Sequence, residues 1–421
     1  MPTVTVPGAN KSTVTLAYDI GANAVLAQQI AAVISAGIAN NTISAADNKS
    51  GSPPALPPGV TGELVLSQSA TTLVPKGYDF VVASAKSSVV FGNGDKNEQV
   101  LAGSGNLRFV ATGGSGSIIT GGGNNLISIL PSDKGDWLIA MGNGNDTIGA
   151  LGGGNDTITA SSGKHLINLG SGSSFVTTAG SDSIFATSGS ETIVASGSDG
   201  KQVISGGASK LFFIAGGAAT VIGGTGSDTV FGGSGKELLE GGSAGGNFLQ
   251  AGDGRATLFG GGNGDQLFAA GDKAQALHAA SGNETLFGGF ASGRDTFFGG
   301  SGKDQITGGG GKNTFVAGTG AATVAANPGA SNVFEFVHGK GGGKELVEGL
   351  TAASQVHIEL LGFGSNEIKN ALASQTSKDG STTITLSDST KVTFQNVGLL
   401  TTSNFSESMV SGKETHDHHD H

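Results

Sequence analysis

The sequence predicts an all-β protein, a parallel β-roll or β-solenoid of about 28 degenerate nine-residue repeats with a short N-terminal helix and a small C-terminal cap. Three observations support this class. Glycine supplies 76 of the 421 residues, proline only 9, and short apolar pairs recur at a spacing close to nine over most of the chain. The proline count excludes collagen-like and proline-rich chains, and the apolar fraction of 37% is large enough for a packed core.

The N-terminal region, residues 1–62, is expected to hold one helix and a linker. Leu26, Ile30, Val33, Ile34 and Ile38 follow one another at spacings of 4, 3, 1 and 4, which is the apolar stripe of an amphipathic helix over residues 20–40. The following run GSPPALPPGVTG excludes a helix because the residue before each proline is held in extended backbone. The apolar stretch is also interrupted by glutamine and serine, so we expect no transmembrane helix.

The repeats are expected to form a solenoid domain over residues 63–335. A step of nine suits a flattened coil in which about six residues turn and three run as a strand, so two repeats complete each of about 14 turns. Glycine is needed where corners are tight and backbones approach closely. We aligned the repeats on the position two residues before each buried apolar residue; the series runs from Glu98 to Ser331 and includes Asn124, Asp136, Asp146, Asp156, Lys164, Ser173, Asp182, Lys201 and Lys210.

The C-terminal region is expected to form a cap over residues 336–402. Asn366–Ser374 predicts a short helix, while Thr382–Leu386 and Lys391–Val397 alternate in polarity and predict a hairpin joined by SDST. Residues 403–421 are expected to be a flexible tail rich in histidine and aspartate.

Charge and cysteine content limit the function classes. The net charge of −11, from 33 acidic and 22 basic residues, disfavours nucleic acid and anionic membranes and is compatible with bound cations. Cysteine is absent, so disulfides and zinc–thiolate sites are excluded. The segment Met1–Leu16 has no apolar core of a cleaved secretory signal.

The repeats resemble a known family. Gly223–Phe231 (GGTGSDTVF) and Gly299–Thr307 (GGSGKDQIT) match the calcium-binding RTX nonapeptide G-G-x-G-x-D-x-U-x at every defined position, and Leu151–Thr159 and Met141–Gly149 match it in part. The closing segment DGSTTITLSDSTKVTFQNV is also similar to the ends of RTX proteins. The resemblance implies a calcium-bound β-roll, export by type I secretion through an uncleaved C-terminal signal, and a secreted or cell-surface location.

The resemblance also implies a set of calcium ligands. Calcium takes six to eight oxygens, and in the family the aspartate and turn carbonyls of one repeat face those of the repeat one full turn later. Asp136 is therefore expected to pair with Asp156, while Asp146 is expected to face Lys164 and Asp182 to face Lys201. A longer ladder and two weaker pairs complete the expected ligands: Asp265, Glu284 and Asp304; Asp228 with Asn247; Asp295 with Asn313.

Other interpretations of these residues stay open. An aspartate in a glycine turn can instead cap backbone N–H groups, which is the favoured interpretation for Asp146 and Asp182. The ending His416–His421 can bind a transition metal or be a plain flexible tail. Ser243 lies in a G-x-S-x-G match that lacks the strand–turn–helix context of a catalytic serine, so we expect no enzyme activity.

The sequence predicts a secreted, non-enzymatic structural protein of the bacterial cell surface or extracellular matrix, such as a surface-layer, biofilm or fibre component. Calcium, Ca2+, is expected to stabilise only part of the β-roll, because many corners lack aspartate. Self-association into a filament or lattice is expected from the exposed strand edges at the ends of a solenoid. The alternative is a calcium-dependent adhesin or a protein that binds cell-surface polysaccharide, although the single Trp and two Tyr give no aromatic row for stacking sugars.

Overall fold

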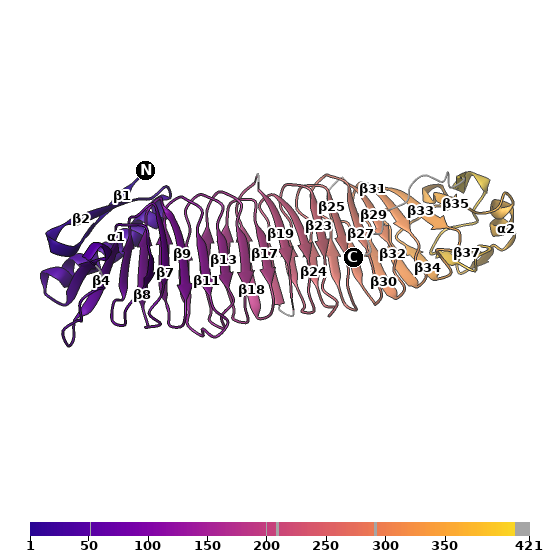
Figure 1. Ribbon diagram of the computed structural model, residues 1–421. Helices are drawn as coiled ribbons and strands as arrows, with labels where there is room; N and C mark the ends of the chain where they lie inside the picture. Colours follow the sequence, from indigo (N-terminus) through magenta and orange to yellow (C-terminus); the bar gives the residue numbers. More distant parts are fainter. Residues whose placement is uncertain (51, 199, 208–209, 290–292, 409–421) are drawn as a thin grey trace. The chain divides into compact units, whose positions relative to one another are not determined.

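A computed structural model describes residues 1–50, 52–198, 200–207, 210–289 and 293–408. It divides into two compact units, Met1–Gly235 and Lys236–His421. Both units are built from the same coil, in which strands alternate between two parallel sheets (Figure 1). The predicted parallel β-solenoid is therefore confirmed.

In the first unit we call the two sheets the even sheet and the odd sheet, after the strand numbers. The even sheet contains β3 (Ile43–Asp47), β4 (Thr61–Leu66), β6 (Phe80–Ala83), β8 (Glu98–Ala102), β10 (Gly116–Thr120), β12 (Trp137–Ala140), β14 (Thr157–Ala160), β16 (Phe175–Thr178), β18 (Ser190–Ala195), β20 (Lys210–Ile214) and β22 (Thr229–Phe231). The odd sheet contains β5 (Thr71–Leu73), β7 (Ser87–Phe91), β9 (Asn106–Ala111), β11 (Leu126–Ile129), β13 (Thr147–Ala150), β15 (Leu166–Leu169), β17 (Ser183–Ala186), β19 (Lys201–Ser205) and β21 (Ala218–Ile222).

The second unit has the same two kinds of strand. Its even sheet contains β24 (Phe248–Gln250), β26 (Gln266–Phe268), β28 (Thr285–Phe287), β30 (Lys303–Thr307), β32 (Ala321–Ala325), β34 (Lys344–Glu348) and β38 (Lys391–Phe394). Its odd sheet contains β23 (Glu237–Glu240), β25 (Ala256–Phe259), β27 (Gln275–His278), β29 (Arg294–Phe298), β31 (Lys312–Val316), β33 (Ser331–Val337), β35 (Ile358–Leu361) and β39 (Phe405–Ser408).

The strand register shows that two repeats make one turn, as the spacing predicts. Ile139 pairs with Ile158, and Ile158 pairs with Val176, so neighbouring strands of one sheet are 18 or 19 residues apart here. These side chains point inward and are fully buried. Each buried aliphatic side chain contributes about 1.5–3 kcal/mol, so every turn adds a similar increment to the core. The described residues form about 16 turns, more than the 14 expected.

Glycine marks the corners where neighbouring turns approach most closely. A Cβ placed on Gly302, the third glycine of the full repeat match GGSGKDQIT, would lie 1.2 Å from the carbonyl oxygen of Gly282 one turn earlier. No side chain fits in that space. The repeat motif is therefore required by the packing of the corners as well as by any ligand.

An N-terminal layer covers part of the first unit. The expected helix is confirmed as α1 (Gly21–Ala39). The antiparallel hairpin of β1 (Thr3–Pro7) and β2 (Thr13–Ala17), joined by a 3₁₀ turn at Ala9–Lys11, was not predicted. Helix and hairpin lie over the first strands (Figure 1). Helix α1 is long and apolar enough to cross a membrane by length and composition, with 33% of that window buried against the protein.

The solenoid begins earlier than residue 63. Strand β3 pairs in parallel with β4, Ile43 opposite Thr61, so β3 already forms the first strand of the even sheet. A 3₁₀ turn at Asn48–Ser50 follows it. The proline-rich segment expected to be an interdomain linker is therefore the loop that closes the first turn. Tyr78 holds this loop by donating a hydrogen bond from its hydroxyl to the carbonyl oxygen of Pro54 at 2.7 Å.

The C-terminal region combines the expected cap with further turns. The expected helix is α2 (Glu367–Ala373), and the expected hairpin is β37 (Ser381–Thr385) with β38, flanked by β36 (Thr376–Lys378). However, β34, β35, β38 and β39 also pair in parallel with preceding solenoid strands. The coil thus continues beyond residue 335 to Ser408, with 3₁₀ turns at Ala353–Gln355 and Thr402–Asn404, and the tail ending His416–His421 lies outside the described residues.

Candidate functional site

The candidate calcium ligands belong to a buried position of the turn that we call the inward slot, the residue two before the inward apolar side chain of each strand. Asp156, for example, precedes the buried Ile158. Polar side chains occupy most of these slots and are nearly inaccessible. The buried slot residues are Glu98, Asn125, Asp146, Asp156, His165, Ser174, Asp182, Glu191, Gln202, Asp228, Glu237, Asn247, Asp265, Gln275, Glu284, Asp295, Asp304, Asn313, Asn332 and Glu345.

Slot carboxylates link consecutive turns through the backbone. The N–H of Trp137 donates to Asp156 Oδ1 at 2.9 Å, and the N–H of Asn247 donates to Asp265 Oδ1 at 2.8 Å. The second oxygen accepts from the residue's own turn: Gly262 N–H donates to Asp265 Oδ2 at 2.9 Å. Capping of glycine turns by aspartate is therefore present in the fold, as the alternative interpretation of these residues predicted.

The ladder predicted at Asp265, Glu284 and Asp304 is present in the second unit. The N–H of Glu284 donates to Asp304 Oδ1 at 3.1 Å, and a Cβ on Gly260 would lie 3.4 Å from both Asp265 Oδ2 and Glu284 Oε1. Carboxylate oxygens from two consecutive turns thus converge on one glycine corner. Glu284 Oε1 is buried and has no hydrogen-bond partner. Burial, reinforced by the charge of Asp304, raises the pKa of Glu284 to about 7.

This corner fits a calcium ion in its chemistry. An unpartnered buried carboxylate oxygen beside other carboxylates is the arrangement that a hard cation stabilises. Among the described residues no three His, Asp or Glu side chains group as a complete ligand set. A calcium ion here would therefore need backbone carbonyls or water for its remaining oxygens.

A second ladder lies on the odd sheet of the second unit. Asp295 is paired in register with Asn313, which in turn donates from Nδ2 to Asn332 Oδ1 at 3.0 Å. Burial raises the pKa of Asp295 to about 6. The predicted neighbours Asp295 and Asn313 are brought together, but two of the three slots carry amides, so this ladder holds less negative charge than Asp265, Glu284 and Asp304.

The prediction that Asp136 shares a buried site with Asp156 is wrong. Asp136 is exposed, and its slot is occupied by the next residue, Trp137, whose indole N–H donates to Asp133 Oδ2 at 3.0 Å. Asp136 instead caps the outside of the turn, where its Oδ1 accepts the N–H of Asn155 at 2.7 Å. Burial raises the pKa of Asp156 to about 6, and the charge of Asp136 adds to this rise.

The partners predicted for Asp146 and Asp182 are also shifted by one residue. Asp146 faces His165 rather than Lys164: its Oδ2 lies 3.3 Å from His165 Nδ1, and both side chains are fully buried. Asp182 is the next slot along, with Oδ1 at 4.0 Å from His165 Nε2, and its following slot holds Gln202 rather than Lys201. Burial alone lowers the pKa of His165, but Asp146 and Asp182 outweigh it and raise the pKa. A buried histidine therefore occupies this corner between the two carboxylates.

Asp228 and Asn247 are both buried slot residues, as predicted. Asp228 lies in the first unit, where its Oδ1 accepts the N–H of Leu211 at 2.9 Å, and Asn247 lies in the second unit, where its Nδ2 donates to Asp265 Oδ1 at 3.0 Å. Their mutual pairing stays a prediction.

Sequence reasoning placed Glu98 at the head of the repeat series but did not name it as a candidate ligand. Glu98 is fully buried with both carboxylate oxygens lacking a hydrogen-bond partner. Burial, with the charges of Asp79 and Asp95, raises its pKa to about 7. The run GNGDKNE, a degenerate glycine turn followed by acid, was the signal that could have revealed this group.

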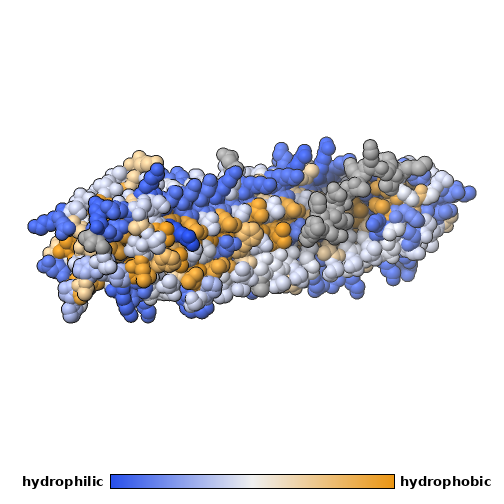
Figure 2. Space-filling view, in the orientation of Figure 1, coloured by the Kyte–Doolittle hydropathy of each residue, from blue (hydrophilic) through white to orange (hydrophobic). Residues whose placement is uncertain are grey.

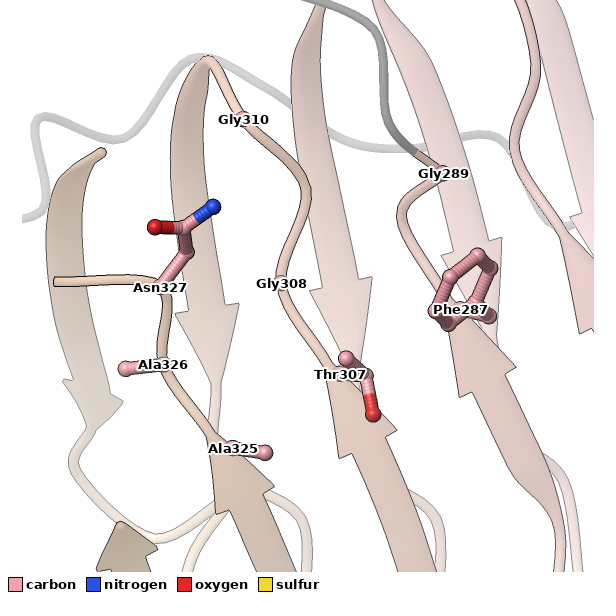
Figure 3. Close-up of a pocket in the computed structure, with 8 residues that line it drawn as sticks. All are labelled: Phe287, Gly289, Thr307, Gly308, Gly310, Ala325, Ala326 and Asn327. Carbon is pink, nitrogen blue, oxygen red and sulfur yellow. The ribbon is translucent and has the colours of Figure 1, made fainter. Parts of the chain in front are cut away.

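One hollow of the second unit lies beside the even sheet, away from the buried slot carboxylates. This shallow hollow of about 310 Å³ is lined mainly by glycine and alanine (Figure 3). Its polar side chains are Thr307 and Asn327, and Asn327 Oδ1 already accepts the N–H of Gly329 at 3.0 Å. Ser243, the serine of the G-x-S-x-G match, is exposed in a turn.

Comparison with protein families gives one result. The model of the RTX calcium-binding nonapeptide repeat matches residues 214–244 and 291–324, with four copies. These segments contain Asp228 and Asp304, the aspartates of the two full motif matches. The protein carries RTX repeats. No match was found among curated proteins or solved structures. The RTX repeats place the chain among calcium-binding, secreted-type repeat proteins, as the resemblance implied.

Proposed function

We propose that this RTX protein is a non-enzymatic structural component of the bacterial cell surface or extracellular matrix, with a coil locked at a few corners by calcium. The observation that carries the proposal is the corner at Gly260, where oxygens of Asp265 and Glu284 converge from consecutive turns. The coil itself supports a structural role, because most of the described residues of both units belong to its strands and turns.

Calcium would be held first by Asp265 and Glu284 at the Gly260 corner, with backbone carbonyls or water as the remaining ligands and Asp304 adding negative charge beside Glu284. The bound cation would neutralise these carboxylates and bond oxygens from neighbouring turns, which ties the turns together. Asp156, Asp228 and Asp295 are further candidates, with Asn247 and Asn313 supplying amide oxygens. Asp146 does not fit, because a buried histidine already lies against it. Calcium dependence is therefore expected to be partial.

Extracellular calcium concentrations would favour the locked coil, whereas scarce calcium inside the cell would leave the acidic corners repelling one another during export. The physical cause of this repulsion is that neighbouring ionised carboxylates are unfavourable in a buried position when no cation is bound beside them. This supports a secreted protein whose coil tightens after export.

A carbohydrate-binding adhesin, the alternative, receives less support. Aromatic rings do form a row on the outer face of the odd sheet in the second unit, but His278 stacks on Phe298 with ring centroids 4.0 Å apart and planes within 4°. Phe259 stacks on the other side of His278 at 4.4 Å. The ring faces are used by one another, so they are not free to stack on sugar rings.

Electron microscopy of the purified protein in calcium and in chelator tests the structural role. Filaments or sheets that form in calcium are the expected result. Dispersed particles in both conditions, together with binding to cell-surface polysaccharide, would favour the adhesin. Circular dichroism should show that chelator removes part of the fold only, and complete unfolding in chelator would contradict the partial role of calcium.

A further inference from the structure

The outer face of the even sheet in the first unit is apolar where α1 and the hairpin cover it. Five outward side chains at one strand position are buried under this layer, although they point away from the core of the coil. These covered rungs are Val65, Val82, Leu101, Ile119 and Ala140, and they pack against Ala24, Ala27, Ala31 and Ile34 of α1. The outer face of the even sheet therefore carries apolar residues where α1 and the hairpin cover it.

The same strand position continues beyond the layer as a surface we call the bare ladder. Its residues follow Ala140 in register and are joined by two neighbouring outward phenylalanines: Thr159, Thr177, Val194, Ile214 and Phe231, with Phe175 and Phe212. Phe175 is 44% exposed, Phe212 38% and Ile214 36%. None of these residues is charged, whereas the chain carries a net charge of −11.

The side of helix α1 that faces away from the sheet is uncharged, with Val25 and Val33 exposed beside Gln28, Gln29 and Ser35. Residues Gly21–Ala39 include no charged side chain. Val25 is 59% exposed and Val33 is 55% exposed, so they lie on the uncovered side of the helix. The first unit therefore presents two adjoining uncharged surfaces with exposed apolar side chains, the outer side of α1 and the bare ladder. Figure 2 shows apolar side chains gathered in patches on the visible face of this part of the molecule.

These two surfaces form a step. Asn23 near the start of α1 donates to the carbonyl oxygen of Thr120 at 3.0 Å, and Gly37 near its end packs against Ile43 of β3, so the helix runs across successive turns. The layer stops at Ile20, which lines a hollow of about 250 Å³ together with Thr159 and Thr177 of the bare ladder. A helix is about 10 Å thick, and this sets the height of the step.

The raised and the lower parts of the step cover the same number of strands. The covered rungs from Val65 to Ala140 and the bare ladder from Thr159 to Phe231 each extend over four strand spacings, which is about 19 Å. A second copy turned by a two-fold axis would place its helix on the bare ladder of the first and receive the first helix on its own ladder, which is an isologous contact.

We infer that the outer side of α1 and the bare ladder form a self-association surface through which two copies of this chain pair side by side. A planar bilayer would touch only the raised part of the step, and this helix has no Lys or Arg on its polar positions and no large aromatic anchors. A copy of the chain fills both levels. Uncharged surfaces also allow two molecules of the same net charge to approach. The inference rests on the proposed structural role in that it names a contact within the assembly.

Sedimentation velocity of the full chain over a wide range of concentration tests the contact. The wild type is expected to form a dimer in calcium and in chelator alike. The double variant Val25→Lys/Val33→Lys and the double variant Phe212→Glu/Ile214→Glu should each weaken the dimer by about tenfold or more. An equimolar mixture of the two should restore pairing, because one contact then joins Lys to Glu and the other stays wild type.

The matched control lies on the opposite face of the same unit. Phe185 and Ile222 of the odd sheet are 40% and 46% exposed, and Phe185→Glu/Ile222→Glu should leave the dimer unchanged. If circular dichroism shows that a charged variant does not fold, the pairs Val25→Ser/Val33→Ser and Phe212→Ser/Ile214→Ser replace it, with weaker pairing expected.

Three outcomes would overturn the inference: a monomeric wild type at every concentration, equal dissociation of the control variant, or no recovery in the mixture. A monomer that binds phosphatidylcholine vesicles through Val25 and Val33 would overturn it in favour of a membrane. Filaments in calcium built from such a monomer would leave the proposed structural role intact. A dimer without larger assemblies would support this contact and count against that role.

Discussion

Replacement of Glu284 by glutamine should have opposite effects with and without calcium. The glutamine keeps the size and an acceptor oxygen, but it removes the charge whose pKa burial and Asp304 raise to about 7. In chelator at about pH 8 the wild-type carboxylate is ionised in an environment that disfavours ionisation. Glu284→Gln should therefore stabilise the second unit in chelator.

The size of this effect follows from the pKa. The difference between the ordinary value of 4.5 and about 7 corresponds to about 3 kcal/mol at most, since each tenfold change in acidity is worth about 1.4 kcal/mol. Glu284 is buried, but Gly260 and Gly261 of the adjoining turn are half-buried, so solvent screening reduces this to about 1–2 kcal/mol. For a unit of this size we expect the melting temperature in chelator to rise by about 3–6 °C.

In calcium the sign should reverse. Wild-type Glu284 would contribute a ligand oxygen beside Asp265, and glutamine would lose that charge interaction with the cation. The calcium-dependent rise in melting temperature, measured by calorimetry in calcium and in chelator, should therefore shrink in Glu284→Gln. An equal change in melting temperature in both conditions would refute the assignment of this corner to calcium.

Glu191→Gln is the matched control for this experiment. Glu191 is also a buried slot glutamate with its pKa raised to about 7 by burial. Its Oε2 accepts the N–H of Ser174, and the strand register places Leu211 in the following slot, so neither adjacent slot holds a carboxylate. Glu191→Gln should stabilise the first unit by a similar amount in calcium and in chelator.

Three further experiments test the fold around the site. Burial raises the pKa of the unpartnered Glu63 to about 8, so the folded state holds this proton more tightly than the unfolded state. The free energy of unfolding should therefore fall as pH rises from about 4.5 through about 8. Glu63→Gln should remove this part of the pH dependence, measured by chemical unfolding. Asp156→Ala should lower the free energy of unfolding in urea by about 1–3 kcal/mol, because the buried N–H of Trp137 loses its acceptor. Asp136→Ala should lower it by less than about 1 kcal/mol, because Asn155 is exposed to water. Equal losses would contradict the register described above. Gly302→Ala should cost about 3 kcal/mol or more, since its methyl group would overlap the Gly282 carbonyl, while Gly364→Ala, with open space around it, should change stability by less than about 0.5 kcal/mol by the same measurement.

The ligand positions show where sequence reasoning reached its limit. At Asp304 only one apolar residue, Ile306, follows at the expected distance, and after Asp265 and Glu284 the first residue of each Leu–Phe pair faces the core. At Asp136 the strand WLIA also offers an apolar pair, Leu138 and Ile139, but here the second residue faces the core. Strand side chains alternate between faces, so a shift of one residue moves the aspartate from the core side to the solvent side.

The sequence by itself determined the coil: the period of nine, the glycines at its corners and the RTX motif at Asp228 and Asp304 follow from local geometry that repeats along the chain. Only the tertiary structure decided which of two neighbouring residues enters the slot, as at Trp137 and His165. It alone also revealed the N-terminal layer over one end of the even sheet, because that contact joins residues far apart in sequence whose pattern is uniformly apolar. Repetition determines the path of the chain, whereas register and coverage depend on packing between turns.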